Sequence, residues 1–536
     1  MEREFQRSVA VGIPPKTMAE DRSSPNNPSQ SPSNSLNKAV SEVWFLAWPT
    51  ILTMTSFTVM QFVDKFMVSK VGPTEVAAQG NAGTWAFAVI ATVIGVVTVV
   101  NTFVSQNLGA GTPEKGPRYP WAAAWLALGA WFIIVVPWAF LIPQVFHFIH
   151  PEEETLISLE STYAVYMLFG SLSLLLGRGF SQYFFGMHMP KVITVSTIIA
   201  NIVNVIANYI LIFGEEGIPG ILPGIPGTPA LGLEGAAIAT VIGMFMEMII
   251  PVAIFLSPKF HNRYGTRTPW RPCFATMRAL FRIGWPGSIQ WGNELICWAL
   301  FMTVFVGGFG TNDMAAGWIA LGYLHLSFMP AIGINVAVNS IVGKYIGAGD
   351  PDTAVSRTRV GVLVAMVYMT VCAAIFIVFR HELMELFVGS DIPEEQKQQI
   401  ITVGAKMLIL VALFQTVDAL GIVYSGALRG AGDTVWPGIV TAIYSWVFIV
   451  GGGWIAVTYF EELGSIGPWI AAAAYVILIG LTMAVRFERG GWRSIDLLGD
   501  QERLEAGRAS PITIGPPASG AEAAATDLVD PPTADQ

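Results

Sequence analysis

Long apolar segments separated by short polar stretches dominate the chain between about residues 43 and 488. A bilayer core is about 30 Å thick, so a helix that crosses it needs about 20 mostly apolar residues. Twelve segments meet this requirement, near 43–68, 82–107, 119–143, 158–184, 191–213, 234–257, 280–306, 317–342, 358–380, 401–427, 436–459 and 466–487. The pattern predicts an all-α integral membrane protein with twelve transmembrane helices.

Basic residues are distributed unevenly among the loops between these segments. Loops after even-numbered segments carry most of the Lys and Arg, including a dense group within 258–279, and loops after odd-numbered segments carry few. Lys65, Lys70, Arg380 and Lys397 run against this bias. Because basic loops remain on the cytoplasmic side, we expect a multi-pass protein of the cell's inner (plasma) membrane with both termini in the cytoplasm.

The two ends of the chain differ in composition from the middle. Residues 1–42 are rich in Ser, Pro and Asn, and residues 489–536 are of low complexity, so we expect both to be disordered cytoplasmic tails. Between them we predict an N-terminal six-helix lobe at 43–257, a cytoplasmic linker at 258–279 and a C-terminal six-helix lobe at 280–488.

The composition agrees with a lipid environment. The chain is 53% hydrophobic and only 12% charged, with a mean hydropathy of +0.56, whereas a soluble chain is about 25% charged. The net charge of -9 does not suggest a nucleic-acid partner. The helices and short loops hold no HExxH, paired-Asp metal motif or Gly-rich phosphate loop. We therefore expect no enzyme activity and no cofactor, and a monomer in contact with membrane lipid.

The two halves of the membrane region repeat one another. Trp48-Pro49 matches Trp285-Pro286, and further matches follow at an offset of about 238 residues. They pair Gly72 with Gly310, Gly95 with Gly333, Asn101 with Asn339, and Gly109-Ala110-Gly111 with Gly347-Ala348-Gly349. Because six helices separate the matches, both halves run in the same direction. Such a parallel repeat about an axis along the membrane normal is a transporter architecture with the substrate path between the halves.

The repeated pattern resembles the multidrug and toxic compound extrusion (MATE) family. The matching motifs are the early prolines Pro49 and Pro286, Val63-Asp64, the Gly-Ala-Gly-Asp loop ending at Asp350, and Leu428-Arg429-Gly430-Ala431-Gly432-Asp433-Thr434. The resemblance covers residues 43–488. It implies an antiporter that uses Na+ or H+ as coupling ion to expel small organic, often cationic, compounds by alternating access.

Within this family the chain is most similar to the NorM-like branch. That branch has acids in helices 1, 7 and 10, which here are Asp64, Glu294 and Asp418, and asparagines in helix 5, here Asn204 and Asn208. The resemblance implies that the three acids couple transport to cation binding and that the asparagines support them. Two departures from related sequences stand out. Phe414 occupies a position where tyrosine is common. Lys65 follows Asp64, which leaves open either an internal Asp64–Lys65 ion pair or an interfacial position for this turn.

Glu294 and Asp418 should lie at the same depth in the membrane. Glu294 follows Arg282 by 12 residues and Asp418 precedes Arg429 by 11, which at about 1.5 Å per residue places both roughly 17–18 Å from the cytoplasmic surface. A carboxylate in the bilayer centre costs at least about 2.5–3.5 kcal/mol unless it is paired, protonated or bound to a cation. The pair would either hold Na+ through oxygen ligands or share a proton, and an organic cation would compete for the same charge.

Simpler interpretations remain open for each of these residues. In the simpler interpretation, each acid, Asp64 included, serves only to form a hydrogen bond with a neighbouring helix. Asn201, Asn204 and Asn208 form one stripe along their helix, which suits interhelical hydrogen bonds as well as it suits a cation-binding network. Arg429 and Asp433 would form a loop or a gating ion pair, and His188 falls in the loop after the fourth helix. The alternative function is a flippase or exporter of a lipid-linked or polysaccharide precursor, against which the near absence of Lys and Arg within the helices argues.

Overall fold

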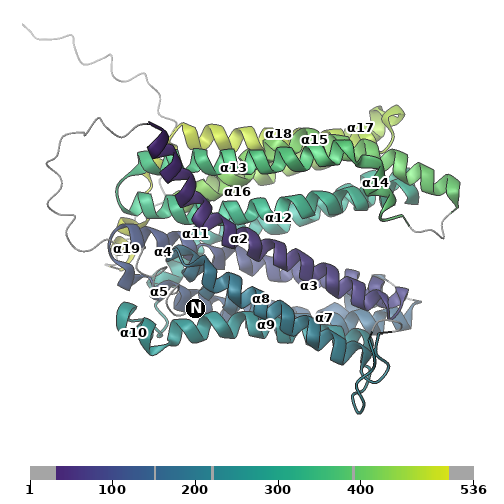
Figure 1. Ribbon diagram of the computed structural model, residues 1–536, viewed down its shortest axis with the longest axis horizontal. Helices are drawn as coiled ribbons and strands as arrows, with labels where there is room; N and C mark the ends of the chain where they lie inside the picture. Colours follow the sequence, from purple (N-terminus) through teal and green to yellow (C-terminus); the bar gives the residue numbers. More distant parts are fainter. Residues whose placement is uncertain (1–31, 150–151, 219–221, 389–392, 506–536) are drawn as a thin grey trace, which may run out of the picture.

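The structure, a computed structural model, describes residues 32–149, 152–218, 222–388 and 393–505. Within these ranges it consists of helices joined by loops, with one isolated β-bridge between Ile218 and Leu222. Among the described residues there are 12 helices that are long and apolar enough to cross a membrane. These pack as two bundles that lie side by side (Figure 1). The prediction of an all-α protein with twelve transmembrane helices is confirmed.

The first bundle spans α2 to α9 and is followed by a short connecting helix. Its elements are α2 (Pro32–Ser69), α3 (Pro73–Thr98), α4 (Val100–Gly109), η1 (Pro113–Lys115), α5 (Arg118–Ala130), η2 (Trp131–Val135), α6 (Val136–Ile149), α7 (Glu154–Gly186), α8 (Pro190–Asn208), η3 (Tyr209–Phe213) and α9 (Gly232–Leu256), with α10 (Pro258–Tyr264) as the connection.

The second bundle spans α11 to α18 and is followed by a short terminal segment. Its elements are α11 (Phe274–Leu300), η4 (Phe301–Val306), η5 (Gly307–Phe309), α12 (Thr311–Gly347), α13 (Pro351–Val378), α14 (Arg380–Glu385), α15 (Glu394–Ala431), α16 (Val435–Tyr444), η6 (Ser445–Gly451), α17 (Gly452–Tyr459), η7 (Glu461–Leu463) and α18 (Ile466–Glu488), with η8 (Gly491–Ser494) and α19 (Leu497–Glu505) at its end.

The first helix begins at Pro32, earlier than the predicted start near 43. Its initial turns are ordered because they pack on the second bundle, where Ala39 and Val43 are buried in a cluster with residues of α12, α15 and α18. Glu42 anchors the same turns, since it accepts a hydrogen bond from Arg357 at 2.7 Å and lies 3.7 Å from Lys344. The helix then crosses to the first bundle (Figure 1). The expected disordered tail is therefore wrong for residues 32–42, and 1–31 lie outside the described residues.

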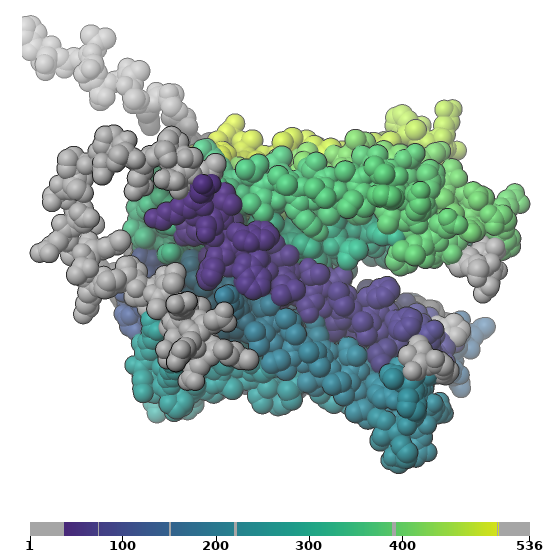
Figure 2. All heavy atoms as spheres, viewed as in Figure 1, coloured from purple at the N-terminus to yellow at the C-terminus, as the bar shows by residue number. Residues whose placement is uncertain are grey.

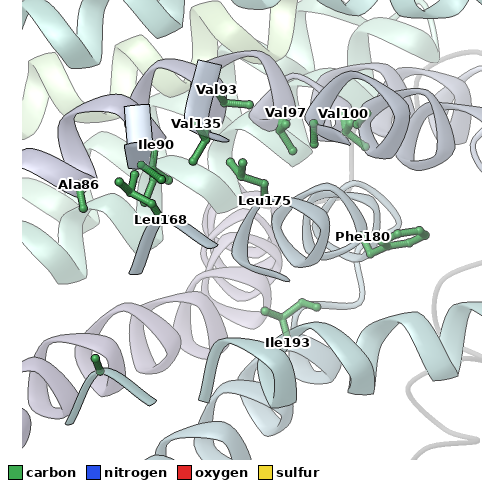
Figure 3. Packing of buried hydrophobic residues seen from close by; sticks show 14 of the residues in the cluster. Ala86, Ile90, Val93, Val97, Val100, Val135, Leu168, Leu175, Phe180 and Ile193 are labelled. Atoms are coloured by element: carbon green, nitrogen blue, oxygen red, sulfur yellow. The ribbon is translucent and has the colours of Figure 1, made fainter. Parts of the chain in front are cut away.

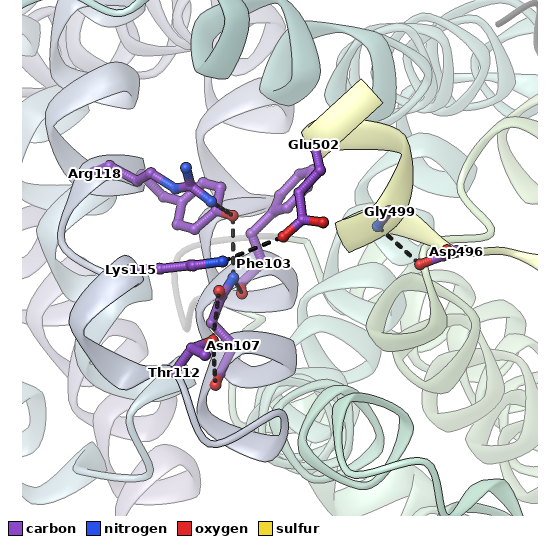
Figure 4. A network of polar contacts seen from close by, with 9 residues as sticks. Phe103, Asn107, Thr112, Lys115, Arg118, Asp496, Gly499 and Glu502 are labelled. Carbon is purple, nitrogen blue, oxygen red and sulfur yellow. Dashed lines mark hydrogen bonds and ion pairs between the residues drawn. The ribbon is translucent and has the colours of Figure 1, made fainter. Parts of the chain in front are cut away.

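The segment after α18 is also ordered as far as Glu505, unlike the predicted tail at 489–536. Trp492 stacks on Phe487 and is buried in the second bundle, whereas Leu497 is buried in the core of the first. Lys115 of η1 pairs with Glu502 of α19 at 3.2 Å (Figure 4). Residues 491–505 thus bridge both bundles, and 506–536 lie outside the described residues.

The core of the first bundle lies between α3 and α7. Ile90, Val93 and Val97 of α3 face Leu168 and Leu175 of α7 (Figure 3), and all five are buried. Lipid tails are as apolar as these side chains, so close packing rather than exclusion from water holds such helices together.

The bundles meet at one end of the molecule, which we call the closed end and which contains loops 110–117, 187–189, 348–350 and 432–434. Here the contacts are reciprocal. A Cβ on Gly109 would overlap the carbonyl oxygen of Lys344, and a Cβ on Gly347 would overlap that of Gln106. The hydroxyl of Thr102 donates to the Arg429 carbonyl at 2.9 Å. The equivalent hydroxyl in the second half, that of Ser340, donates to the Phe185 carbonyl at 2.6 Å.

The opposite end, which contains the loop residues 214–218, 222–231 and 460–465, is the open end. Figure 2 shows the bundles separated there by a cleft and in contact at the closed end. The repeat in the sequence therefore appears in space as a two-fold arrangement that is closed at one end only.

We predict that Gly347→Ala weakens the closed end. The added methyl group has no room against the Gln106 backbone, and overpacking of this kind costs about 1–3 kcal/mol. The melting temperature of the purified protein should fall. Gly322→Ala is the matched control, because it lies in the same helix and its Cβ would meet no atom within 4 Å. Equal melting temperatures for the two variants would contradict a glycine-dependent seal.

Candidate functional site

Glu294 and Asp418, predicted to lie at one depth, are close together inside the second bundle. Glu294 lies on α11 and Asp418 on α15, and both side chains are partly buried. The two carboxylates are near enough to interact electrostatically. We call Glu294, Asp418 and their immediate partners the carboxylate pair site.

A third helix contributes a hydroxyl group to this site. Tyr475 of α18 is 4% exposed, and its phenol donates a hydrogen bond to Glu294 Oε1 at 2.8 Å. Close packing of α15 on α18 positions it, because the backbones approach at Gly421 and Gly480, where a Cβ on Gly421 would lie 3.1 Å from the Gly480 Cα. Asp418 has no hydrogen-bond partner among the described residues, so its charge is less well satisfied than that of Glu294.

The neighbouring turn of α11 is fixed to η6. Asn293 donates to the Ser445 hydroxyl at 2.6 Å and accepts from the Trp446 indole at 2.7 Å. Ser445 begins a π-helical stretch, and a second one, η4, follows α11. π-Helical turns are rare and occur frequently at functional sites. These bonds set the rotation of α11 that directs Glu294 toward α15 and α18.

Arg429 and Asp433 do not form the gating ion pair considered above. Asp433 instead pairs with Arg486 at 2.8 Å. Arg429, at the end of α15, interacts electrostatically with Glu294. The carboxylate pair site therefore has a fixed positive charge on the side of the closed end.

Asp64 occupies a separate polar site in the first bundle. It is 8% exposed and accepts a hydrogen bond from the Asn208 amide at 2.5 Å. The same amide donates to Asn204 Oδ1 at 3.2 Å. Asn204 Nδ2 and Asn208 Oδ1 are buried without a hydrogen-bond partner in the described part of the chain. Asp64, Asn204 and Asn208 thus form one cluster, as their predicted shared role requires.

The positions of Lys65, Asn201 and Phe414 in the structure decide what each of these side chains does. The ion pair between Asp64 and Lys65 is wrong, because Lys65 is exposed and Asp64 bonds Asn208 instead. Asn201 has the simpler role of interhelical bonding, since its amide donates to the backbone and hydroxyl oxygens of Ser56. Phe414 is completely buried and supplies no oxygen to the carboxylate pair site.

Both sites have oxygen donors suited to a small hard cation. Carboxylate, amide and hydroxyl oxygens are the ligands that such ions prefer. No group of three or more His, Cys, Asp or Glu that would suggest a transition-metal site occurs among the described residues.

Comparison with known proteins identifies this architecture. The sequence model of the MatE family matches residues 49–210 and 295–455, which together exceed half of the chain. The chain belongs to the MatE family. The expected relationship is therefore confirmed, and this MatE protein is a membrane transporter rather than an enzyme.

Curated relatives and solved structures agree with that assignment. The protein is 28% identical over 466 residues to "Probable multidrug resistance protein NorM" of Burkholderia pseudomallei, covering 85% of this chain and 94% of the relative. It is 29% identical over 464 residues to "Multidrug resistance protein NorM" of Burkholderia vietnamiensis, covering 84% and 94%.

Among solved structures, a MATE protein in complex with MaL6 superimposes with a TM-score of 0.75 at 19% identity, covering 87% of this chain and 97% of the other. A MOP superfamily transporter from Pyrococcus furiosus gives 0.74 at 20% identity, with the same coverage. At these identities the likeness concerns the fold.

One site residue, Tyr475, escaped the sequence analysis, and so did the electrostatic interaction of Arg429 with Glu294. Tyr475 lies in an uninterrupted apolar stretch, where a tyrosine is as consistent with lipid contact as with a site. The interaction of Arg429 with Glu294 depends on how α15 and α11 pack against each other, which the sequence does not reveal. The sequence places Tyr475 in the last transmembrane helix. It contains no further polar residue near Tyr475 that would indicate which face of this helix points into the bundle.

We predict that Asn208→Ala destabilises the protein because it removes the hydrogen-bond donor of buried Asp64. Leaving such a group unsatisfied costs about 1–3 kcal/mol, whereas replacing both partners by apolar groups is close to neutral. The melting temperature should therefore fall in Asn208→Ala and recover in Asp64→Ala/Asn208→Ala. Purely additive effects of the two substitutions would show that the bond contributes nothing.

Proposed function

We propose that this MatE protein is a cation-coupled antiporter that exports small organic cations, including drugs or toxic compounds, by alternating access. The observation that carries the proposal is the carboxylate pair site, where Glu294 and Asp418 lie together within a membrane-embedded bundle and Asp418 has no hydrogen-bond partner among the described residues. The names of the NorM relatives, which describe multidrug resistance, support the cargo class.

Two neighbouring carboxylates in a low-dielectric interior repel each other, and either Na+ or a proton relieves that repulsion. The same negative charge attracts an organic cation. A protein that holds the coupling ion in one arrangement of its bundles and the cargo in the other exchanges them across the membrane. The second polar site, formed by Asp64, Asn204 and Asn208, offers further oxygen ligands for the ion or the cargo.

The shape of the molecule supports alternating access. The bundles are separated at the open end and sealed at the closed end by reciprocal backbone contacts. The loops of the closed end and of the connection after α9 carry most of the loop bases, so we place this end in the cytoplasm of an inner-membrane protein, with both termini there. Since one chain provides both bundles, we propose that a monomer is the transporting unit, surrounded by membrane lipid.

Uptake into inverted membrane vesicles tests this function, because the cytoplasmic face of the membrane is outside in such vesicles. A fluorescent organic cation such as ethidium is added to the outside, and a Na+ gradient and a pH gradient are imposed separately. We predict that at least one gradient drives transport. Glu294→Gln and Asp418→Asn should each reduce driven transport to the level of vesicles that lack the protein, because each removes one of the two competing charges.

The matched control is Glu395→Gln, which neutralises an exposed acid in the first turn of the same helix as Asp418. It should transport like the parent. Parent-like transport by Asp418→Asn, with equal protein in the membrane, would remove Asp418 from the coupling site. If the vesicles transported a lipid-linked anion and no organic cation, the proposed cationic cargo would be wrong.

A further inference from the structure

His188 has a backbone conformation that no other residue with a side chain adopts in the described part of the chain. It lies in the loop between α7 and α8, and its φ is 59°. This left-handed conformation is unfavourable for an L-residue, because its Cβ atom comes too close to the following carbonyl oxygen. Such strain persists when the surrounding structure requires it, and it often marks a functional position.

The equivalent loop of the second bundle has the same shape without this cost. There Gly432 takes the left-handed position, with a φ of 89°. The Asp433 amide donates to the Leu428 carbonyl at 2.9 Å, just as the Met189 amide donates to the Phe184 carbonyl at 2.8 Å. Glycine therefore suits this loop, and the first bundle has a histidine in its place.

The imidazole of His188 reaches across to the other bundle. Its Nε2 lies 3.1 Å from the carbonyl oxygen of Ser340 on α12, and because a carbonyl only accepts, Nε2 carries the proton of this hydrogen bond. The Ser340 hydroxyl returns a bond to the Phe185 carbonyl at 2.6 Å. His188 is thus part of the seal at the closed end.

Charged groups on two packed helices surround the ring. The ring is partly buried. Its removal from water, together with the nearby ammonium of Lys344 on α12, lowers the pKa of His188 to about 4. The bond to Ser340 and the carboxylate of Glu42 on α2 act in the opposite direction. Lys191, at the start of α8, is directed over the rings of Phe45 and Trp48. The ring is therefore neutral at physiological pH while the seal is closed.

We propose that His188 is a proton-binding latch that keeps the closed end shut while neutral and favours its opening when protonated. The proposal shares with the proposed function only the premise that the two bundles separate at this end. It does not depend on which ion the carboxylate pair site uses. Because this end faces the cytoplasm in our assignment, acidification of the cytoplasm would raise the fraction of transporter open to cytoplasmic cargo.

The expected size of the pH effect follows from the pKa of His188 when the end is closed and when it is open. In an opened end the hydrated ring has an ordinary pKa of about 6.5. A group with a lower pKa in the closed form stabilises that form at high pH, and the stabilisation is lost as the pH falls from about 6.5 toward 4. Between pH 8 and pH 5 the ratio of open to closed molecules should rise roughly 30-fold.

Distances between spin labels at Glu114→Cys and Ser356→Cys measure this ratio. Both positions are exposed at the closed end, on η1 and α13 respectively. The full chain, with Cys273 and Cys372 replaced by serine, is reconstituted in lipid nanodiscs and measured by double electron–electron resonance from pH 8 to pH 5. We expect the long-distance population to grow as the pH falls.

Two variants test whether the imidazole of His188 causes the pH dependence. His188→Asn tolerates the left-handed backbone and removes the titratable ring, and His188→Gly reproduces the loop of the second bundle. Both should lose most of the pH dependence, while remaining able to adopt both distances. A pH dependence in both variants equal to that of the parent, or none in the parent, would overturn the proposal. Because the readout is a distance, a failure of ion-coupled efflux leaves this result unaffected.

Discussion

An incompletely satisfied negative charge inside a membrane protein is the constraint on which this structure depends. Glu294 has one hydrogen bond, from Tyr475, and a distant positive charge at Arg429, whereas Asp418 has the repulsion of Glu294 and no hydrogen bond among the described residues. A soluble protein would compensate such a pair with water. In a membrane the compensation must come from the protein, from a proton or from a bound cation. A coupled transporter requires that the coupling ion and the organic cation replace each other at such a charge.

The two-fold repeat provides two similar bundles whose relative movement such an exchange requires. Equivalent residues of the two halves make equivalent contacts across the closed end, as Thr102 and Ser340 do with carbonyls of the opposite bundle. This interface combines close backbone approaches with hydrogen bonds from side chains to carbonyl oxygens of the opposite bundle. The departures from this symmetry include the histidine at 188 and the segment 491–505, which contacts both bundles.

The sequence predicted the helices well because length and hydropathy determine what crosses a bilayer. It also placed Glu294 and Asp418 at one depth, because the rise per residue is constant in a helix. Whether the two face each other depends on helix rotation, which the bonds of Asn293 and the close approach of Gly421 to Gly480 determine. The ordered turns before residue 43 and after 488 were missed because they are polar locally and gain their stability from contacts distant in sequence, such as those of Glu42 and Leu497.

The central claim is that coupling ion and organic cation compete for one negative charge. Displacement measured on purified protein in nanodiscs tests it without any transport step. Protein equilibrated with radioactive Na+, or in weakly buffered solution for protons, is titrated with ethidium, and the released ion is counted. We predict release in proportion to ethidium bound, and its loss in Asp418→Asn. Binding of ethidium together with fully retained Na+ and protons would contradict the account.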